Sequence, residues 1–376
     1  MNTFADKIYD RFETLKETSL SKRRFKYKEI ESLIINKNKA VFDISKAGES
    51  YEKRSIYLIK AGKGEQKILL WSQMHGNEPT ATQSIFDILN FIEKPGIFKS
   101  EQSLILENCS LYFIPLLNPD GCERFTRRNA QGIDINRDAL RLEAPESKIL
   151  MTVRDEINAD YGFNLHDQDI WYAAGNTNKP ASLSFLTPSF NEAKDINESR
   201  KRSMQLIASV NRLLQNYIPG QTARYKDDFM PTAFGDNIQS KGTSTILIES
   251  GGYYKDPEKQ YIRKLNTVSI LHALFMISNK MHLNESTKSY FNIPFNEKNK
   301  LFDYILRNVR IKGKHGTFSA DIGIRSEAGV DSDTFEVADI GDLSQYFGYL
   351  EKDMQQYELK NVVIGDDAVS LIEKFT

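Results

Sequence analysis

Four runs of apolar residues in this sequence are each followed at once by a polar residue. The four polar residues are His75, Asn118, His166 and Glu249. Because the runs are almost continuously apolar, we expect them to be strands that are covered on both faces. In open sheets of that kind, ligands bind beyond the carboxyl ends of the strands. The sequence therefore predicts that these four side chains point into one crevice.

Segments with helical periodicity alternate with these runs. An apolar stripe at helical spacing follows Pro79 and recurs in 145–160, 199–217 and 261–281. Two shorter strands, 40–44 and 54–61, precede the first run and flank a polar turn that contains Gly48. Antiparallel strands beside buried ones indicate a mixed sheet. We therefore expect an α/β fold with a mixed, mostly parallel central sheet and helices on both faces.

The pattern of the sequence changes after about residue 286. The stretch 292–298 is polar and contains a proline. Short segments then alternate apolar and polar residues, at 309–312, 318–324, 334–340 and 359–364. This alternation is typical of strands with one face in water. We expect residues 1–286 to form the domain that carries the crevice and residues 287–376 to form a small β-rich C-terminal domain.

Composition disfavours several kinds of partner. Fifty Lys and Arg against 51 Asp and Glu give a net charge of −1, which argues against a surface for nucleic acid. No stretch approaches the roughly 18 apolar residues of a membrane span, and the first twenty residues lack a signal-peptide core. With Cys109 and Cys122 as the only cysteines, no disulfide framework is expected. We expect a cytoplasmic protein that binds neither membrane nor nucleic acid.

Two of the strand-end residues and a close neighbour match the ligand set of a catalytic zinc ion. Such a site takes three protein ligands from His, Glu and Asp and keeps a fourth position for water. His75 and Glu78 form a His-x-x-Glu pair, and His166 ends another predicted strand. A His-x-x-Glu pair alone also occurs as two solvated side chains. Structural or exposed positions are expected for the other histidines, which are His272, His282 and His315.

The polar segment 118–138 contains three arginines after a predicted turn at 118–121. They are Arg127, Arg128 and Arg137. Arginine presents a planar fork that matches a carboxylate, so the segment suits the capture of an anionic terminus. The same side chains would also serve as ordinary surface charges of a loop. The residues alone leave both interpretations open.

Taken together, these motifs resemble those of the M14 family of zinc metallocarboxypeptidases. The matching motifs are His-x-x-Glu at 75–78, Asn-Pro-Asp-Gly at 118–121, Arg-x-Asn at 127–129, Gly-x-Asp-x-Asn-Arg at 132–137, Asn-Leu-His at 164–166 and Leu-Ile-Glu-Ser-Gly at 247–251. They stand in the order of the family and lie between residues 65 and 255. Each motif is common by itself, but the ordered set is specific. The resemblance implies the family's α/β fold and one zinc ion per chain.

The resemblance also implies a role for each matching residue. The zinc ligands would be His75, Glu78 and His166. Arg127 would polarise the scissile carbonyl, and Asn136 and Arg137 would bind the free C-terminal carboxylate of the substrate. Glu249 would be the general base and acid. A second carboxylate is needed because a glutamate that binds the metal cannot also move protons.

Some positions depart from the family pattern. The family's mobile Tyr, about twenty residues before the general base, has no clear counterpart, and only Tyr225 lies in that window. Arg128 is an alternative to Arg127 at the oxyanion. The short segment 138–165 resembles the compact, bacterial-type branch of the family, near the succinylglutamate desuccinylase and aspartoacylase types of deacylase. For Asp167 and Asp169, orientation of His166 and plain exposure to solvent are both open.

We therefore expect a zinc-dependent metallocarboxypeptidase, a hydrolase that cleaves the C-terminal peptide bond of a peptide. Zinc-activated water and Glu249 would carry the reaction. The rival expectation is a zinc amidohydrolase that removes the acyl group of an N-acyl amino acid, whose free carboxylate would bind in the same way. A third is a catalytically silent binding module that keeps the fold. Retention of the three ligands and of Glu249 disfavours it, since a binding protein needs no base.

Overall fold

The structure is a computed structural model that describes residues 3–326, 334–355 and 357–373. Eight strands form the central sheet in the order β1-β2-β4-β3-β5-β9-β7-β8. Their bounds are β1 Asp43–Glu49, β2 Ser55–Ala61, β3 Gln66–Ser72, β4 Cys109–Ile114, β5 Tyr161–Asp167, β7 Leu183–Leu186, β8 Thr222–Arg224 and β9 Ser244–Ser250. The central strands β4, β3, β5 and β9 run parallel, while β1, β2 and β7 join through antiparallel pairs. The predicted mixed α/β sheet is confirmed.

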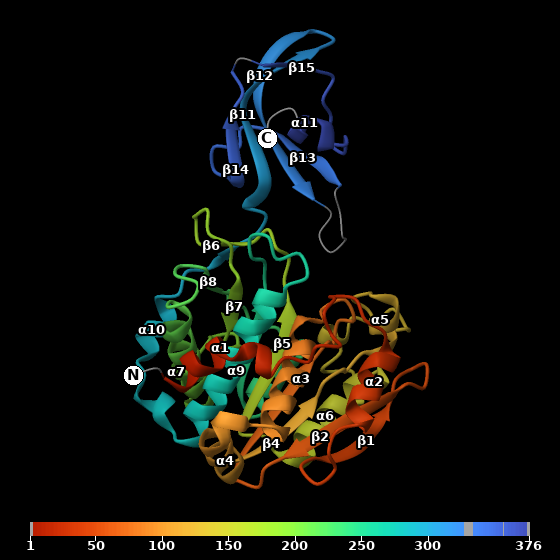
Figure 1. The fold of residues 1–376 in the computed structure, drawn as a ribbon, viewed down its shortest axis with the longest axis vertical. Coiled ribbons are helices and arrows are strands. Elements are labelled where there is room, and N and C mark those ends of the chain that lie inside the picture. The colour runs from red at the N-terminus through yellow and green to blue at the C-terminus, as the bar shows by residue number, and fades with distance from the viewer. Residues whose placement is uncertain (1–2, 327–333, 356, 374–376) are drawn as a thin grey trace.

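Helices cover both faces of this sheet (Figure 1). Their bounds are α1 Phe4–Asp10, α2 Tyr27–Ile35, α3 Thr80–Glu93, α4 Lys99–Asn108, α5 Pro119–Arg124, α6 Pro145–Ile157, α7 Glu198–Leu214, α8 Phe234–Ser240, α9 Gln260–Ser278 and α10 Thr287–Phe291. Strand β3 shows why its sequence is continuously apolar. Ile68 and Leu70 point into the core formed with α3, α7 and α9, while Leu69 and Trp71 point into the core formed with α6 and α8. Both faces are therefore buried.

The first strand differs from its prediction. We expected it to end at residue 44 with Gly48 in a turn, but β1 continues to Glu49. Gly48 lies at a β-bulge, and a Cβ there would come within 2.5 Å of the side chain of Ile149 on α6. The glycine leaves room for the Ile149 side chain where the helix packs on the strand, and it does not form a turn. A sequence pattern does not separate these two uses of glycine.

The predicted turn at 118–121 is also different in the structure, where it begins α5. Pro119 occupies the first turn, where its missing N–H is not needed, and the Asn118 side chain accepts a hydrogen bond from the N–H of Gly121 at 2.8 Å. The amide of Asn118 donates to the carbonyl of Met74 at 3.1 Å. Asn118 therefore supports the loop before His75 and does not point into the crevice as expected.

The C-terminal region is β-rich, as predicted. Its sheet has the order β13-β12-β11-β14, with β15 paired to β11. The bounds are β11 Leu301–Gly313, β12 Gly316–Ser326, β13 Phe335–Gly341, β14 Phe347–Asp353 and β15 Glu358–Lys360, followed by helix α11 Val369–Glu373. Figure 1 shows these strands in blue, beyond the end of the large domain that carries β6. The strand β14 had no counterpart in the expected pattern, and the boundary after residue 286 stays a prediction.

Two short strands connect the C-terminal region with the large domain. β6 (Ala173–Ala174), in the loop after β5, pairs with β10 (Asn296–Glu297), in the segment before β11. The N–H of Leu301 also donates to the carbonyl of Trp171, and these two side chains share a small core. Trp171 therefore packs between the domains. Among the described residues, no helix has both the length and the apolarity needed to cross a membrane.

A buried ion pair ties three parts of the large domain together. Arg263 on α9 and Asp87 on α3 are both completely buried, with Nη2 2.5 Å from Oδ1. Arg263 Nη2 also donates to the main-chain carbonyl of Glu17 at 2.9 Å. The irregular N-terminal segment is thus fixed to two helices by one guanidinium group. Burying such a charge is unfavourable unless its partners are complete.

We expect Asp87→Asn to lower the free energy of unfolding by about 3 kcal/mol, because it leaves the Arg263 charge buried without a counterion. Urea denaturation followed by tryptophan fluorescence measures the loss. The matched control is Glu49→Gln in the solvent-accessible pair with Lys46, where we expect stability to change little because water screens the pair. Equal losses in the two variants would contradict this role of the buried pair.

Candidate metal centre and active site

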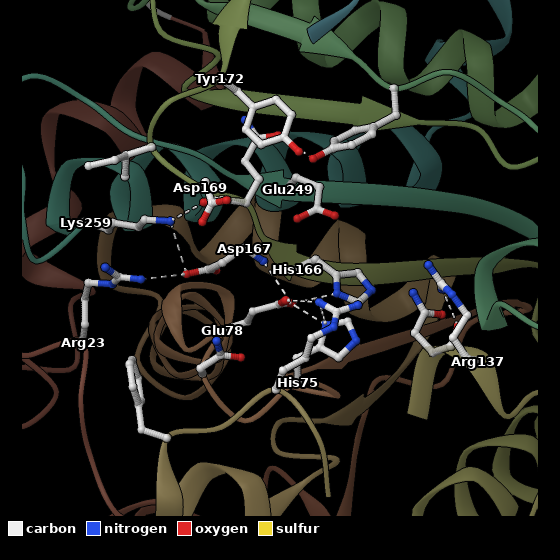
Figure 2. Close-up of a pocket in the computed structure, with 17 residues that line it drawn as sticks. Arg23, His75, Glu78, Arg137, His166, Asp167, Asp169, Tyr172, Glu249 and Lys259 are labelled. Carbon is white, nitrogen blue, oxygen red and sulfur yellow. Dashed lines mark hydrogen bonds and ion pairs between the residues drawn. The ribbon is translucent and has the colours of Figure 1, made fainter. Parts of the chain in front are cut away.

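The three predicted ligands converge in the structure. Nδ1 of His75 lies 2.7 Å from Oε1 of Glu78, and Nδ1 of His166 lies 2.8 Å from Oε2 of the same carboxylate. One ligand atom from each residue lies within 4.8 Å of the others, and all three residues are buried. Figure 2 shows both rings turned towards the Glu78 carboxylate. The predicted metal site is therefore confirmed as an arrangement of these side chains.

Three neighbouring elements hold the ligands in place. His75 follows β3, Glu78 precedes α3, and His166 is the sixth residue of β5. Between the first two ligands, Gly76 must be a glycine, because a Cβ there would lie 1.9 Å from the main chain of Gly121. The loop that carries His75 is thus pressed against the start of α5. Parallel strands end at the same edge of the sheet, which explains why the sequence pattern located these residues correctly.

The chemistry of this cluster fits a zinc ion. Two imidazole nitrogens and a carboxylate are the donors of a catalytic zinc site with three protein ligands. The Nε2 atom of His75 lies 3.1 Å from Oδ1 of Asp134, a partner that fixes the ring and directs Nδ1 towards the metal position. Burial opposes ionisation of Glu78, but the positive charges of His75 and His166 outweigh it and hold the pKa of Glu78 well below its ordinary value.

A cavity of about 450 Å³ opens beside the three ligands. Its volume is that of a pocket for a small-molecule ligand. The residues predicted for catalysis or substrate binding all line it, namely Arg127, Asn136, Arg137 and Glu249. Their positions are described in turn below.

Arg127 reaches the metal ligands. Its Nη1 lies 3.2 Å from Nδ1 of His75 and 3.3 Å from Oε1 of Glu78, while its Nε donates to Oδ2 of Asp134 at 3.1 Å. Arg128, the alternative at this position, donates instead to the main-chain carbonyl of Gly132 and is not part of the cavity lining. The geometry thus separates two arginines that the sequence left equivalent.

Asp134 is a residue whose importance the sequence analysis missed. The same carboxylate contacts His75 and Arg127 and accepts a hydrogen bond from the N–H of Asn136 at 3.0 Å. It therefore begins the short turn Ile135–Arg137 that presents Asn136 and Arg137 to the cavity. The signal was available, because Asp134 is the acidic position of the Gly-x-Asp-x-Asn-Arg motif, but the motif alone did not show what it touches.

Glu249 stands directly beside His166 in the sheet, since the two residues are register partners on β5 and β9. Its Oε2 atom is buried and has no hydrogen-bond partner among the residues that the structure describes. Burial, and then the negative charges of Glu78 and Asp167, raise the pKa of Glu249 well above its ordinary value. Glu249 therefore lies beside the metal ligand His166 but is not one of the three clustered ligands.

Asp167 holds Glu78 and not His166. Its main-chain N–H donates to Oε2 of Glu78 at 3.2 Å, and its carboxylate accepts from the hydroxyl of Thr80 at 2.6 Å. Lys259 Nζ lies 3.6 Å from the same carboxylate. Burial lowers the pKa of this buried lysine to about 8. From the sequence, orientation of His166 was one of the roles open for Asp167. In the structure Asp167 contacts Glu78 instead.

Two tyrosines, Tyr172 and Tyr225, line the same cavity as Glu249. The hydroxyl of Tyr225 donates to Oε1 of Gln168 at 2.9 Å, and the rings of Tyr172 and Tyr225 are 6.1 Å apart. Gln168 is itself fixed by a bond from its amide to the carbonyl of Ala181 at 2.7 Å. Tyr225, the only tyrosine in the window expected for the family's mobile residue, is thus anchored at its hydroxyl.

The fold and the site define an α/β protein with a candidate metal centre, and comparison with known proteins shows what it resembles. Residues 30–205 match the model of the family described as "Zinc carboxypeptidase". This part of the chain is similar to that family, peptidase M14. The similarity agrees with the expectation drawn from the six motifs.

Curated relatives are carboxypeptidases by name. Carboxypeptidase SOL1 of Arabidopsis thaliana is 32% identical over 103 residues, which cover 25% of this chain and 21% of that protein. Carboxypeptidase 2 of Trichophyton rubrum is 26% identical over 136 residues, which cover 35% of this chain and 24% of that protein. The chain therefore matches no more than about a quarter of the length of these two relatives.

Solved structures share the fold at low sequence identity. A metallo-carboxypeptidase from Pseudomonas aeruginosa, solved with (2-guanidinoethylmercapto)succinic acid, has a TM-score of 0.54 at 16% identity and covers 69% of both chains. The metallo-carboxypeptidase from Burkholderia cenocepacia has a TM-score of 0.53 at 16% identity, covering 67% of this chain and 68% of that one. At this level of identity, the likeness supports the fold alone.

We expect the purified protein to bind one equivalent of zinc and His75→Ala to lose it, because two ligands no longer complete the site. Metal content after dialysis, measured by mass spectrometry, tests this directly. His315→Ala, at an exposed position in the C-terminal sheet, is the matched control and should keep its zinc. A His75→Ala protein that is folded and retains one zinc ion would show that the metal is held elsewhere.

Proposed function

We propose that this protein is a zinc-dependent metallocarboxypeptidase that releases the C-terminal residue of a peptide. The observation that carries the proposal is the composition of one cavity. It brings together a buried set of three candidate metal ligands, the separate carboxylate of Glu249, and two arginines, Arg127 and Arg137. Hydrolysis at the C-terminus of a peptide requires a metal, a group that transfers protons and cations that bind the carbonyl oxygen and the terminal carboxylate. The proposed location is the cytoplasm, which the two unpaired, buried cysteines support.

The zinc ion, when bound by His75, Glu78 and His166, supplies Lewis acidity and a water of lowered pKa. Glu249, a buried carboxylate beside His166, would take a proton from the attacking water and deliver it to the leaving amine. Arg127 donates to the oxygen of the scissile carbonyl as negative charge develops there. Its bond to Asp134 keeps the guanidinium in place for this task.

Asn136 and Arg137 bind the terminal carboxylate of the substrate in the proposed mechanism. The guanidinium of Arg137 offers a planar pair of donors for a bidentate contact. The Oδ1 atom of Asn136 accepts from the N–H of Phe234 at 3.0 Å, which leaves the amide nitrogen of Asn136 to donate. Both residues lie on the short turn that Asp134 begins, so their spacing from the metal ligands is fixed.

A second candidate is a zinc amidohydrolase that acts on an N-acyl amino acid. It would use the same ligands, Glu249 and Arg137. The observation in its favour is that the cavity is walled by Arg23 and Phe125 as well as by the predicted residues. These two side chains restrict the room for a long acyl half. Release of amino acids from short peptides, compared with release from N-acyl amino acids, distinguishes the candidates.

We expect Glu249→Gln to lower kcat by about 10²- to 10⁴-fold, because the amide cannot accept the proton of water. Zinc content and KM should change little, since Glu249 belongs to neither the ligand set nor the carboxylate site. Glu107→Gln, at an exposed position on α4, is the control and should be fully active. Unchanged hydrolysis in Glu249→Gln would remove the basis of the proposed mechanism.

We expect Arg137→Gln to raise KM by about 10- to 100-fold for a peptide with a free C-terminus, because a charge-assisted contact is lost. A peptide with an amidated C-terminus should be cleaved poorly by wild type and variant alike. Arg141→Gln, an exposed arginine four residues further on, is the control. If the variant loses activity equally on the free and the amidated peptides, Arg137 has some other role.

A further inference from the structure

A third arginine of the cavity lining, Arg23, lies at the end away from Arg137. We propose that Arg23 forms a subsite for a carboxylate on the acyl half of the substrate, the half that does not carry the C-terminus. The inference rests on the proposed function, because it takes the direction of the substrate from Arg137. It implies a substrate that is anionic at both ends, such as a short peptide with an acidic residue before the scissile bond.

The main chain around Arg23 is held rigidly although it is neither helix nor strand. The side-chain amide of Gln83 on α3 donates to the carbonyl of Lys22 at 2.7 Å, and the N–H of Arg23 itself donates to the carboxylate of Glu258 at 2.6 Å. The Arg263 side chain holds the earlier residue Glu17 in the same way. Arg23 is therefore positioned before any ligand arrives, which lowers the entropy lost on binding.

The guanidinium of Arg23 has unused hydrogen-bonding capacity. Its side chain is 14% exposed, and its Nε atom is buried without a hydrogen-bond partner in the described part of the chain. Its Nη2 atom lies 4.0 Å from Oδ2 of Asp167. That is beyond hydrogen-bond distance. A buried donor without an acceptor is unfavourable, so an acceptor from the substrate would complete the site.

Asp167 has closer partners than Arg23. Its carboxylate accepts a short hydrogen bond from Thr80 and lies 3.6 Å from Nζ of Lys259. Lys259 in turn donates to the main-chain carbonyls of Gln168 at 3.0 Å and Ser250 at 2.8 Å. The lysine is thus committed to the protein, whereas the arginine is not.

The charges at this end of the cavity favour an anion. Two buried cations, Arg23 and Lys259, surround one buried carboxylate, that of Asp167. Asp169 also lines the cavity, but it is exposed to water, which screens its charge. Because Lys259 is the closer cation to Asp167, the guanidinium of Arg23 is open to an anion, and its planar fork suits a carboxylate.

The subsite lies on the correct side of the metal ligands for the acyl half. In Figure 2, Arg23 and Arg137 are on opposite sides of the group formed by His75, Glu78 and His166. Asp167 connects the two regions, since its carboxylate faces Arg23 while its N–H donates to Glu78. Asp167 thus lies between Arg23 and the metal ligand Glu78. This short separation suits a short acyl group.

This subsite does not come from the part of the chain that matches the family. The family match begins at residue 30, whereas Arg23 precedes it. The adjacent Arg24 also contributes to the wall, because its guanidinium lies over the ring of Phe125 at 5.5 Å. The N-terminal segment therefore contributes part of the cavity wall and the charge of Arg23 to a site whose other residues lie after residue 30.

The test compares two substrates that differ only in charge at the acyl end. An N-succinyl amino acid and the corresponding N-succinamoyl amino acid have nearly the same shape, but only the first has the second carboxylate. We expect wild type to favour the carboxylate by about 10- to 100-fold in kcat/KM, and Arg23→Gln to abolish this preference while changing the neutral substrate less than about threefold. Arg23→Lys should retain part of the preference, because it keeps the charge without the planar fork.

Lys28→Gln is the matched control, since it removes one positive charge from an exposed position five residues away. It should behave as wild type with both substrates. Two dipeptides, one with Asp and one with Asn before the scissile bond, provide the same comparison with peptide substrates. Equal effects of Arg23→Gln on charged and neutral substrates, or a wild type without preference, would overturn the proposal.

Binding separates this proposal from the proposed function. Calorimetric titration of zinc-loaded Glu249→Gln, with and without Arg23→Gln, measures affinity for the same two compounds without turnover. We expect the tighter binding of the dicarboxylate to disappear in the double variant. If no compound is hydrolysed by wild type but this difference in affinity is found, the proposed function fails and the subsite stands. If hydrolysis occurs without the difference, only the subsite fails.

Discussion

The carboxylate of Glu78, shared between two imidazole rings, is the interaction on which the site depends. It is buried, and its oxygens meet Nδ1 of His75, Nδ1 of His166 and the N–H of Asp167. A buried carboxylate is tolerated only when such partners are complete. Its partners come from the ends of β3 and β5, so the parallel pairing of these strands is a condition for the site to exist.

A second carboxylate extends this arrangement from the metal ligands to the substrate-binding groups. Asp134 contacts His75 and Arg127 and begins the turn that carries Asn136 and Arg137. The segment that contains these residues is irregular and contributes few core side chains. Its order at the cavity therefore comes from charged hydrogen bonds and not from apolar packing, which makes Asp134 the link between metal binding and substrate binding.

Prediction from sequence succeeded where the signal was local. Continuously apolar runs identified the buried strands, and His75 and His166 were located because parallel strands end at one edge. It failed where one residue type serves two purposes. Asn118 followed an apolar run but caps α5, and Gly48 accommodates a helix and not a turn. The role of Asn118 depends on the direction of its side chain after the strand. The role of Gly48 depends on how closely the helix packs on the strand.

The sequence by itself determined the α/β fold, the three metal ligands and the list of residues from which a reaction mechanism can be built. Hydrophobic pattern and the ordered motifs suffice for these, because each strand end and each motif is a local pattern, even though His166 lies 88 residues after Glu78. Only the tertiary structure distinguished Arg127 from Arg128 and brought Arg23 and Lys259 to the cavity. Residues 23 and 259 meet Asp167 through the packing of distant segments. No periodicity in the sequence encodes that contact, because it arises only when the N-terminal segment docks on α3 and α9.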